Sequence, residues 1–434
     1  MFKFIALSGK FIIRRRKFLR YKNIQMNSFS NKHKIFNDPI YGFVSLPYEI
    51  IFDLIEHPYF QRLRRIKQLG LTNLVYPGAL HTRFHHAMGA MHLMGQAIEE
   101  IRSKGHEISE EEAKAVNIAI LLHDIGHGPF SHALEHSIVS NVNHEDISQL
   151  FMNKLNKEFN GELTLAIKIF QNKYHKKFLH QLVSSQLDMD RLDYLKRDSF
   201  FTGVSEGVIS SDRIIKMLDV ANDQLAVEAK GIYSVEKFII ARRLMYWQVY
   251  LHKTVLSAEN LLVNILKRAK ELAKKKIDLF CTPALKTFLY NQYSKKDFKE
   301  KPELLEAFAN LDDYDIMASI KVWVSHKDAV LSMLCKQLVN RRLFKVEMQN
   351  QPFKETKIRE IKNEVKKQLR LNDKDVNYFV FSGNVVNDAY RGDKISINIL
   401  FKDGTLVDIA KASDQLNIAV LEKTVKKYYL CYPK

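Results

Sequence analysis

The chain of 434 residues is 46% hydrophobic and 27% charged, which is typical of a compact globular protein and excludes disordered, fibrous and repeat compositions. No apolar run reaches the ~18 residues needed to cross a bilayer, so no membrane span is predicted. The formal net charge is +18, but residues 1–37 contain ten Lys or Arg and no Asp or Glu, so the remaining chain is only mildly basic. This surplus suits phosphate-bearing partners or weak nucleic-acid binding, and equally a solvated basic face.

Residues 1–33 are interpreted as a basic tail in front of the folded chain. Their basic cluster follows a short apolar stretch, which is the wrong order for a secretory signal. A mitochondrial-type presequence would share this composition, but translation that begins at Met26 is the preferred interpretation of residues 1–25. Cys281, Cys335 and Cys431 are far apart and odd in number, so they predict neither a disulfide framework nor a paired-cysteine metal site. These features predict a cytoplasmic protein.

The first part of the body has the pattern of a helical fold. Segment 38–47 combines Pro and Gly with a short apolar alternation, which predicts a loop with a small hairpin. Apolar residues then recur at spacings of three and four between Gly-, Pro- or Asn-rich breaks. The predicted helices span 49–69, 84–103, 111–123, 131–139, 143–158, 161–172, 177–197, 209–220 and 233–274, the last long enough for two helices.

The pattern changes beyond about residue 300. Helical periodicity gives way to β-branched and aromatic alternation in the segments VNYFVFSG, DKISINILFKDGTLVDIA and KKYYLCYP. The last helices are predicted at 302–309, 313–322, 326–339 and 355–369. The predicted fold class is therefore mainly α, with a helical core at 34–300 and a smaller α+β region at 301–434.

Residues 115–138, AVNIAILLHDIGHGPFSHALEHSI, carry the most informative chemistry. An apolar helix delivers His123 and Asp124 side by side at its end, and Gly126, Gly128 and Pro129 then turn the chain. An imidazole beside a carboxylate suits a divalent cation if other segments complete its coordination. This segment therefore predicts one part of a metal site.

Two other segments offer the remaining ligands. His86 lies near the start of a predicted helix and can face the core. Asp188, Asp190 and Asp193 are interleaved with leucines on another helix, and carboxylates so close to apolar positions require partners. Any one of them alone would be explained as a surface acid of an amphipathic helix.

The blocks HDIGHGPFSH, NHEDIS and DMDRLDYLKRD resemble those of the HD-domain phosphohydrolases, and within them the branch of deoxynucleoside triphosphate triphosphohydrolases. The resemblance covers about residues 34–260 and makes the predicted helical core an HD domain. It implies one divalent ion held by His86, His123, Asp124 and Asp190. Mn, Fe, Mg, Co, Ni and Zn all suit such a ligand set.

The resemblance also implies the reaction, which is hydrolysis of a deoxynucleoside triphosphate to the deoxynucleoside and inorganic triphosphate. His132 and Glu135 are three residues apart and share a helix face, so the acid can orient the imidazole for acid–base catalysis. A surface ion pair is the alternative for these two residues. The resemblance nominates His144 as a proton donor to the leaving oxygen.

Substrate contacts are implied by matched positions. The residues nominated for the phosphates are Arg83, His127, Arg191, Tyr194 and Arg242. Those nominated for the sugar are Gln68 and Asp198, at its 3′-hydroxyl, and Leu69 and Tyr250, where a 2′-hydroxyl would project. Many relatives carry a histidine where this chain has Tyr246, which loses a possible positive charge toward the γ-phosphate and weakens the predicted preference for triphosphates.

Nucleotide activation between subunits is common in this group. The matching positions are Lys34, Asn37, Arg64, Val75 and Lys253, with Glu56 in place of an aspartate that recognises guanine. The resemblance therefore predicts a homo-oligomer, a dimer or tetramer, whose activity depends on a nucleotide. No residue pattern indicates a base preference.

Two other functions are compatible with the sequence. HD folds also hydrolyse nucleoside monophosphates and signalling nucleotides. The chain could instead be a catalytically silent nucleotide- or nucleic-acid-binding regulator that uses its basic tail. The presence of all four predicted metal ligands, together with His132 and Glu135, argues against a silent site, because a binding protein has no chemical need for them.

Overall fold

The computed structural model describes residues 34–130, 142–387, 390, 396–414 and 424–434. Within these residues helices predominate and the strands form three small sheets, which confirms the predicted mainly α class with an α+β C-terminal region. No helix in this part of the chain is long and apolar enough to cross a membrane.

The described chain begins with a hairpin, as predicted. Strands β1 (Ile35–Asp38) and β2 (Gly42–Ser45) pair antiparallel. One carboxylate oxygen of Asp38 accepts the backbone N–H groups of Ile40 and Tyr41, at 2.8 and 3.1 Å, and so closes the turn. The other carboxylate oxygen of Asp38 accepts a hydrogen bond from a buried residue, Arg197.

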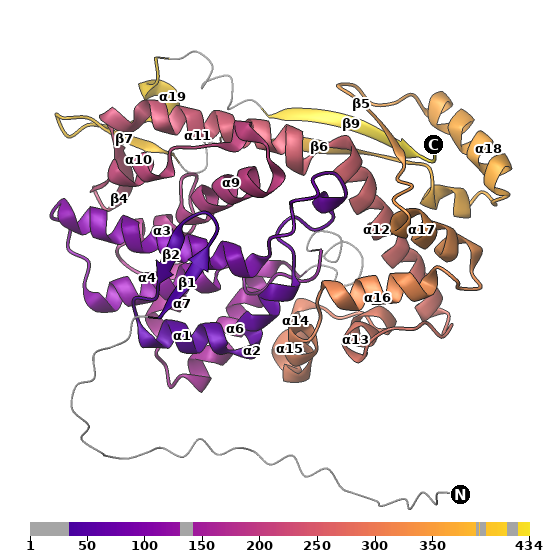
Figure 1. The fold of residues 1–434 in the computed structure, drawn as a ribbon, viewed down its shortest axis with the longest axis horizontal. Coiled ribbons are helices and arrows are strands. Elements are labelled where there is room, and N and C mark those ends of the chain that lie inside the picture. The colour runs from indigo at the N-terminus through magenta and orange to yellow at the C-terminus, as the bar shows by residue number, and fades with distance from the viewer. Residues whose placement is uncertain (1–33, 131–141, 388–389, 391–395, 415–423) are drawn as a thin grey trace, which may run out of the picture.

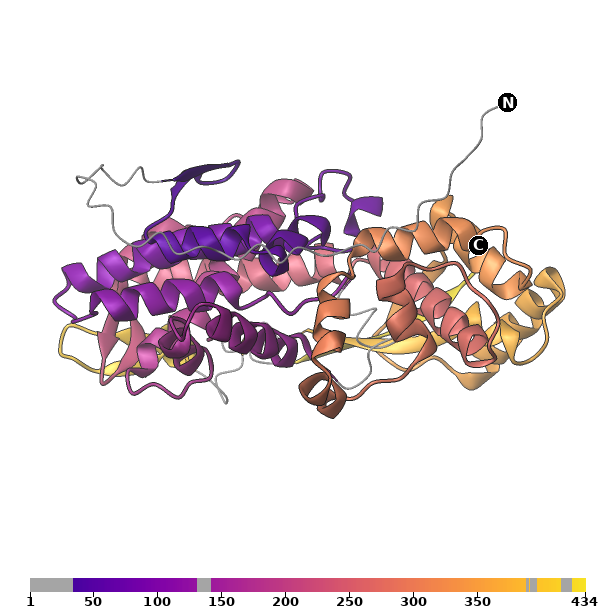
Figure 2. The same ribbon diagram turned by 90° about the horizontal axis from the view of Figure 1, so that it is seen from below.

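The helical body packs around α3. Its members are α1 (Glu49–Glu56), α2 (Pro58–Gln61), α3 (Arg83–Ser103), α4 (Glu110–Leu122), α6 (His144–Glu158), α7 (Thr164–Phe170), α8 (Lys177–Val183) and α9 (Met189–Thr202). Helix α3 packs against both α4 and α9. It can do so closely because buried small residues such as Ala87, Ala90 and Ala97 leave room for neighbouring side chains. Figures 1 and 2 show these helices gathered in the indigo-to-magenta part of the molecule.

Three predicted helices are wrong in extent. The prediction 49–69 fails at His57, where the chain leaves the helix before Pro58 and then continues in short turns, among them η1 (Arg62–Arg65) and η2 (Thr72–Leu74). The prediction 177–197 fails because the Asp188 side chain accepts the Arg191 N–H and starts α9 afresh. The predicted helix 131–139 lies outside the described residues.

The third error is at 209–220, where part of the predicted helix is a strand in the structure. Only α10 (Ser211–Lys216) is helical, and Leu218–Ala221 forms β3, which pairs antiparallel with β4 (Gln224–Glu228). The turn residues Asn222 and Asp223 both have positive φ, 53° and 61°, as a tight two-residue hairpin requires. An apolar period that suits a helix therefore misled the prediction where the Asn-Asp pair was the stronger signal.

The next segment crosses the molecule. Helix α11 (Ile232–Met245) passes into a π-helical turn, η5 (Tyr246–Tyr250), and then into α12 (Lys253–Lys274). The prediction that 233–274 is long enough for two helices is confirmed. A π-helical turn widens the backbone and often marks a functional site.

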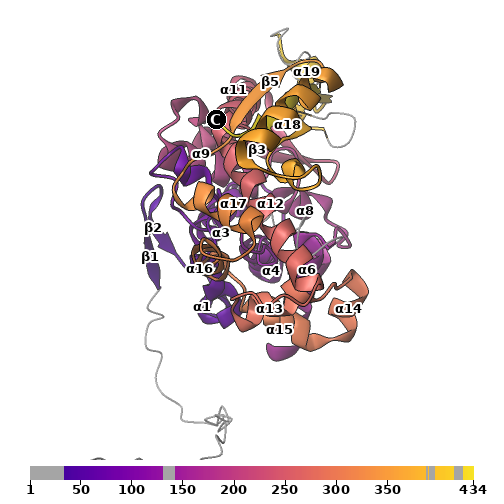
Figure 3. The ribbon, with the colours of Figure 1, turned by 90° about the vertical axis from the view of Figure 1, so that its right-hand side faces the viewer.

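The C-terminal region combines helices with two sheets. Its elements are α13 (Pro283–Tyr290), α14 (Lys295–Glu300), α15 (Pro302–Ala309), α16 (Asp313–Trp323), α17 (Ala329–Val339), β5 (Lys345–Gln349), α18 (Glu355–Leu369), η6 (Asp375–Tyr378), β6 (Phe381–Asn387), β7 (Asn398–Leu400), β8 (Leu406–Asp408), α19 (Ile409–Ala412) and β9 (Val425–Tyr432). Helix α12 packs against α17 and β5, and Figure 3 views the molecule from the side on which α12, α17 and α18 lie.

The sheets connect distant parts of the chain. Strands β5, β9 and β6 form an antiparallel sheet, whereas β7 joins β4 in parallel and extends the β3–β4 hairpin. The buried hydrophobic residues form one cluster that runs from Val44 to Cys431. Because core and sheet both cross residue 300, the proposed boundary between 34–300 and 301–434 stays a prediction.

Candidate active site and metal centre

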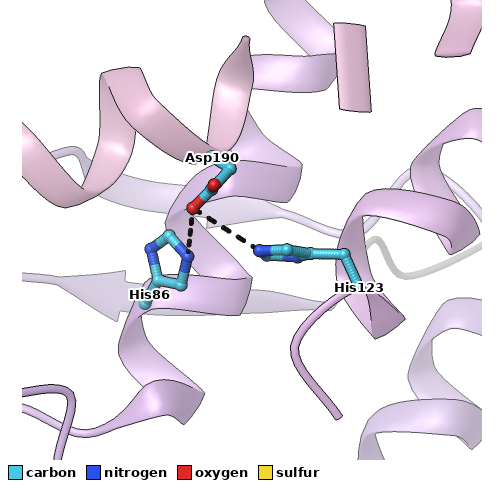
Figure 4. A group of neighbouring side chains, drawn as sticks. All are labelled: His86, His123 and Asp190. Carbon is cyan, nitrogen blue, oxygen red and sulfur yellow. Dashed lines mark ion pairs between the residues drawn. The ribbon is translucent and has the colours of Figure 1, made fainter. Parts of the chain in front are cut away.

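Three helices bring two imidazoles and a carboxylate to one point, shown in Figure 4. His86 lies in the first turn of α3, His123 ends α4, and Asp190 lies in the first turn of α9. One oxygen of Asp190 is 3.1 Å from Nε2 of His86 and 3.5 Å from Nε2 of His123. The side chain of His86 is fully buried and that of Asp190 is 26% exposed, so the cluster opens on the carboxylate side.

Each imidazole is oriented by a bond at its other nitrogen. Nδ1 of His86 donates to Asp193 at 2.8 Å, and Nδ1 of His123 donates to the backbone carbonyl of Ile120 at 2.6 Å. Both Nε2 atoms are buried without a hydrogen-bond partner among the described residues. This arrangement, in which one nitrogen is fixed by a second residue and the other faces a carboxylate, is that of histidines which bind a metal.

The electrostatics of the cluster favour a cation. Burial would lower the pKa of His86, but Asp190 and Asp193 raise it to about 10. Burial would raise the pKa of Asp190, yet His123 and His86 hold it far below its usual range. The two carboxylates thus stabilise positive charge at Nε2 of His86, where a divalent ion can take the place of a proton.

Asp124, the fourth predicted ligand, lies at the edge of this cluster. Its oxygens are 3.4 Å from Nε2 of His123 and 3.9 Å from Nε2 of His86. Arg83 donates to Asp124 at 2.5 Å, and Nε2 of His127 is 3.2 Å away. The structure therefore brings the four predicted metal ligands together, with Asp124 shared between the cluster and the adjoining Arg83 and His127.

A buried ion pair holds the cluster from behind. Arg197 donates two bonds to Asp193, at 2.9 and 3.0 Å, and a third to Asp38 of the β1–β2 hairpin at 2.9 Å. Burial would raise the pKa of Asp193, but Arg197 and His86 lower it to about 2. Sequence analysis missed Arg197 and Asp38, because only the folded chain shows that the hairpin reaches α9.

The turn after His123 is fixed on both sides. The Gly126 N–H donates to Ser148 Oγ, which itself donates to the His123 carbonyl. A Cβ atom at Gly126 would lie 2.2 Å from the backbone of α6, so this position accepts no side chain. The buried Arg62 donates to the carbonyls of Ile125 and His127 from the opposite side. The predicted turn is thus confirmed, although the role of Arg62 was not foreseen.

Two histidines stack beside the cluster. The rings of His127 and His144 lie 3.9 Å apart, at 14° to each other. Burial and the nearby Arg83 hold the pKa of His127 well below its usual range. The candidate catalytic residues His132 and Glu135 lie outside the described residues.

A cavity of about 320 Å³ adjoins the cluster. Seven of the predicted substrate-contacting residues line it, namely Gln68, Leu69, Arg83, Tyr194, Asp198, Tyr246 and Tyr250. Asp198 accepts hydrogen bonds from His81 and from the Tyr250 hydroxyl, both at 2.7 Å. The η5 turn supplies the tyrosines, with the rings of Tyr246 and Tyr250 5.1 Å apart.

Other lining residues were not foreseen. These are Lys67, Gly70, Thr72, Phe130, Leu251 and Glu259. Glu259 comes from the first half of α12, and burial raises the pKa of its carboxyl group to about 7. The helical period that places Glu259 beside Leu256 and Leu262 gave no signal that it faces a cavity.

The remaining predicted phosphate ligands are held by neighbours. Arg191 pairs with Asp188, the residue that caps α9. Arg242 donates to the side chain of Gln186 at 3.0 Å, and its guanidinium lies 6.0 Å from the centre of the Tyr246 ring. Neither is among the residues that line the 320 Å³ cavity.

The residues matched to nucleotide activation are distributed over several elements. Lys34 lies over the ring of Phe52, and Arg64 lies over that of Phe84, 3.6 Å from its centre. The others are Asn37 in β1, Glu56 at the end of α1, Val75 after η2 and Lys253 at the start of α12. Their role stays a prediction.

This fold and site define a class: helices that bring a histidine, a His-Asp pair and a later aspartate to one point. The HD-domain model matches residues 83–198, and the model for the HD-associated region matches residues 209–282. An uncharacterised protein of Bacillus subtilis, YwfO, is 32% identical over 423 residues, which cover 94% of each chain. The chain belongs to the HD-domain phosphohydrolase superfamily, in its branch of dNTPase-like members.

Solved structures and named relatives agree with this placement. The crystal structure of a phosphohydrolase from Bacteroides thetaiotaomicron is 55% identical, with a TM-score of 0.90 over 93% of this chain and all of that one. The Dictyostelium discoideum protein named as a homologue of the deoxynucleoside triphosphate triphosphohydrolase SAMHD1 is 34% identical over 273 residues, which cover 58% of this chain and 53% of that protein. The site therefore belongs to a hydrolase.

Proposed function

We propose that the chain hydrolyses deoxynucleoside triphosphates to the deoxynucleoside and inorganic triphosphate. One observation carries this proposal: Arg83 both donates to Asp124 of the metal cluster and lines the adjoining cavity. A phosphate chain that enters the cavity therefore meets a guanidinium at the edge of the metal site. The name of the Dictyostelium relative supports a deoxynucleoside triphosphate as the substrate.

His86, His123, Asp124 and Asp190 would hold one divalent ion. When bound, this ion supplies Lewis-acid stabilisation of a phosphoryl oxygen and a bound water of lowered pKa. Arg83, which already donates to Asp124, is placed to donate to a phosphate oxygen of the substrate. The Tyr194 hydroxyl lines the same cavity and can donate in parallel.

The paired histidines suit transfer of a proton to the leaving sugar oxygen. The low pKa of His127 keeps its ring neutral, so that it can donate a hydrogen bond without adding charge. His144 stacks on it and is assigned the proton donation. His132 and Glu135 are assigned the positioning of the attacking water on sequence grounds alone.

The far part of the cavity suits a deoxyribose. Asp198 is fixed by His81 and Tyr250, and the buried amide oxygen of Gln68 has no hydrogen-bond partner among the described residues. Both groups can accept the 3′-hydroxyl. Leu69 and the Tyr250 ring also line the cavity. They are assigned the wall toward which a 2′-hydroxyl would project, so that steric exclusion would disfavour ribonucleotides.

Arg191 and Arg242 complete the proposed phosphate contacts. Each is held by a side chain, Asp188 or Gln186, that leaves part of its guanidinium available for a ligand. Tyr246 lies against Arg242 and supplies a hydroxyl where many relatives supply an imidazole. We further infer a cytoplasmic homo-oligomer activated by a nucleotide through Lys34, Asn37, Glu56, Arg64, Val75 and Lys253.

Product analysis tests the reaction directly. The protein is incubated with Mn²⁺ or Mg²⁺ and all four deoxynucleoside triphosphates, so that one can activate hydrolysis of another, and the products are separated by ion exchange. Deoxynucleoside with uncleaved triphosphate is the expected result. Release of phosphate or pyrophosphate would overturn the bond assignment. Absence of turnover would favour a monophosphate or signalling-nucleotide substrate, or a binding role.

A further inference from the structure

A second cavity, of about 650 Å³, lies between α12 and the sheet of β5, β9 and β6. It shares no lining residue with the cavity beside the metal cluster. One wall is a single face of α12, whose residues recur at spacings of one helical turn: Asn260, Val263, Asn264, Lys267, Lys270, Glu271 and Lys274. The opposite wall consists of Lys374, Asn377, Tyr378, Phe381, Ser382 and Tyr429.

The charge of this cavity is strongly unbalanced. Four lysines line it, Lys267, Lys270, Lys274 and Lys374, against one carboxylate, Glu271. Glu271 lies 3.6 Å from Arg268, so its charge is already partly matched outside the lysine group. Among the described residues, no carboxylate lies within ion-pair distance of Lys267, Lys274 or Lys374. The cavity therefore concentrates positive charge that an anion can neutralise.

Lys270 sits deepest in this group. It is only 8% exposed, and burial together with Lys274 lowers the pKa of its ammonium group to about 8. A bound anion would replace part of the lost solvation and restore the charged form.

The other lining groups are of a different kind. Gly383 of β6 faces Tyr429 of β9, and a Cβ at this glycine would lie 2.4 Å from the tyrosine hydroxyl, so the missing side chain lets the ring lie across the strand. The hydroxyl of Tyr429 then reaches the amide oxygen of Asn260 at 3.4 Å. Asn264 donates to the carbonyl of Tyr378 at 2.9 Å. The amides and rings are thus held in place around the lysines.

We propose that this cavity binds a nucleoside polyphosphate, with the lysines at its phosphates and Tyr378, Phe381 and Tyr429 beside its base. Lysines alone would suit any phosphate, but a free phosphate fills only a small part of this volume and has no need of aromatic rings or amides. A base offers a ring face for the tyrosines and polar edges for the asparagines. The site is additional to the catalytic centre and to the positions matched to nucleotide activation.

Photo-crosslinking of the full chain with 8-azido-ATP tests this inference. The reaction is run in EDTA, which removes the divalent ions required for hydrolysis, and the labelled peptides are identified by mass spectrometry. Labels on peptides that contain Tyr378 or Tyr429 are expected, and unlabelled ATP should remove them better than inorganic phosphate does. Labels confined to peptides of the cavity beside the metal cluster would overturn the proposal.

A double variant, Lys267→Gln with Lys374→Gln, measures the contribution of the lysines. Both side chains are exposed, so the fold should persist, and the half-saturating probe concentration should rise about tenfold or more. Lys327→Gln with Lys402→Gln removes the same charge at exposed sites outside the cavity and should leave labelling unchanged. Equal losses in both double variants would reduce the effect to general electrostatics and reject the site.

A competition experiment distinguishes binding of a nucleotide in this cavity from binding of a nucleic acid. A single-stranded oligodeoxynucleotide should displace the probe only at far higher phosphate concentration than ATP. If the oligonucleotide binds through the same two lysines while the probe labels neither tyrosine peptide, the cavity is part of a nucleic-acid surface and the proposal is wrong.

Discussion

The metal cluster and the cavity next to it are built in opposite ways. In the cluster, three of the four predicted ligands have a second residue that fixes them: Asp193 holds His86, the Ile120 carbonyl holds His123, and Arg83 holds Asp124. In the cavity, the buried Gln68 amide oxygen has no hydrogen-bond partner among the described residues, and the carboxyl group of Glu259 lines the same space. Metal coordination tolerates little displacement, whereas a substrate pocket retains groups whose partners arrive with the ligand.

This comparison predicts large losses in the cluster and small ones in the cavity. Asp190→Asn should have the largest effect, since it keeps the size of the side chain but removes the charge that two imidazoles face. We expect metal content to fall and turnover to drop by about 10³-fold or more. Metal analysis and turnover, measured on the same preparation, check this.

Asp212→Asn is the matched control. Asp212 is 81% exposed and lies 3.6 Å from Lys196, so its loss should change neither measurement. An Asp190→Asn protein with full metal content and full activity would remove Asp190 from the ligand set.

Asp193→Asn should have the next largest effect. Among the described residues, it leaves the buried Arg197 with Asp38 as its one ionic partner and weakens the bond that orients His86. Metal affinity should fall about 10–100-fold, and the free energy of unfolding should fall by about 3 kcal/mol. Metal titration and urea unfolding measure the two losses separately.

Arg197→Lys distinguishes charge from orientation. A lysine keeps the positive charge but cannot make the two parallel bonds to Asp193. We expect a smaller loss of metal affinity than in Asp193→Asn. Unchanged metal binding in both variants would show that His86 does not need this support.

The sequence predicted the cluster far better than its surroundings. His123 and Asp124 are adjacent in the chain, and His86 and Asp190 each start a strongly periodic helix, so local patterns and a family resemblance sufficed. Arg197, Asp38 and Glu259 were missed because their partners are set by how α9, the hairpin and α12 meet. The β3–β4 hairpin was missed for a different reason, since the apolar period of 209–220 suits a helix and outweighed the local turn signal of Asn222 and Asp223.

Changes in the cavity should be smaller and should affect selectivity. Tyr250→Ala removes the ring from the wall where a 2′-hydroxyl would project, so the preference for deoxynucleotides over ribonucleotides should fall about tenfold. The ratio of kcat/KM for dGTP and GTP measures this. Tyr250→Phe keeps the ring but loses the bond to Asp198, and its ratio should stay near that of the unchanged protein.

If both Tyr250 variants lose selectivity equally, the hydroxyl and Asp198 carry the discrimination. If neither does, Leu69 or another part of the wall excludes the ribose. Either result would revise the proposed sugar site without touching the metal cluster.

Glu259→Gln should have the smallest effect, and it depends on pH. Burial raises the pKa of Glu259 to about 7, above its ordinary value, so the folded protein binds a proton more tightly than the unfolded chain does. Below about pH 5, Glu259 is protonated in the folded protein, and its burial costs little free energy. As the pH rises through about 7 the buried carboxyl group ionises, and the free energy of unfolding falls. Glutamine cannot ionise, and the variant should be more stable than the parent at pH 8, by about 1 kcal/mol, but not at pH 5.

Thermal unfolding at the two pH values measures this difference, with an expected gain of about 2 °C at pH 8 for a chain of this size. Glu303→Gln, at an exposed position of α15, supplies the control and should show no such pH dependence. An equal gain at both pH values would mean that the carboxylate is ionised throughout and has a cationic partner in the cavity. In that case Glu259 would be a fixed residue like those of the cluster, and the contrast between the two regions would not extend to α12.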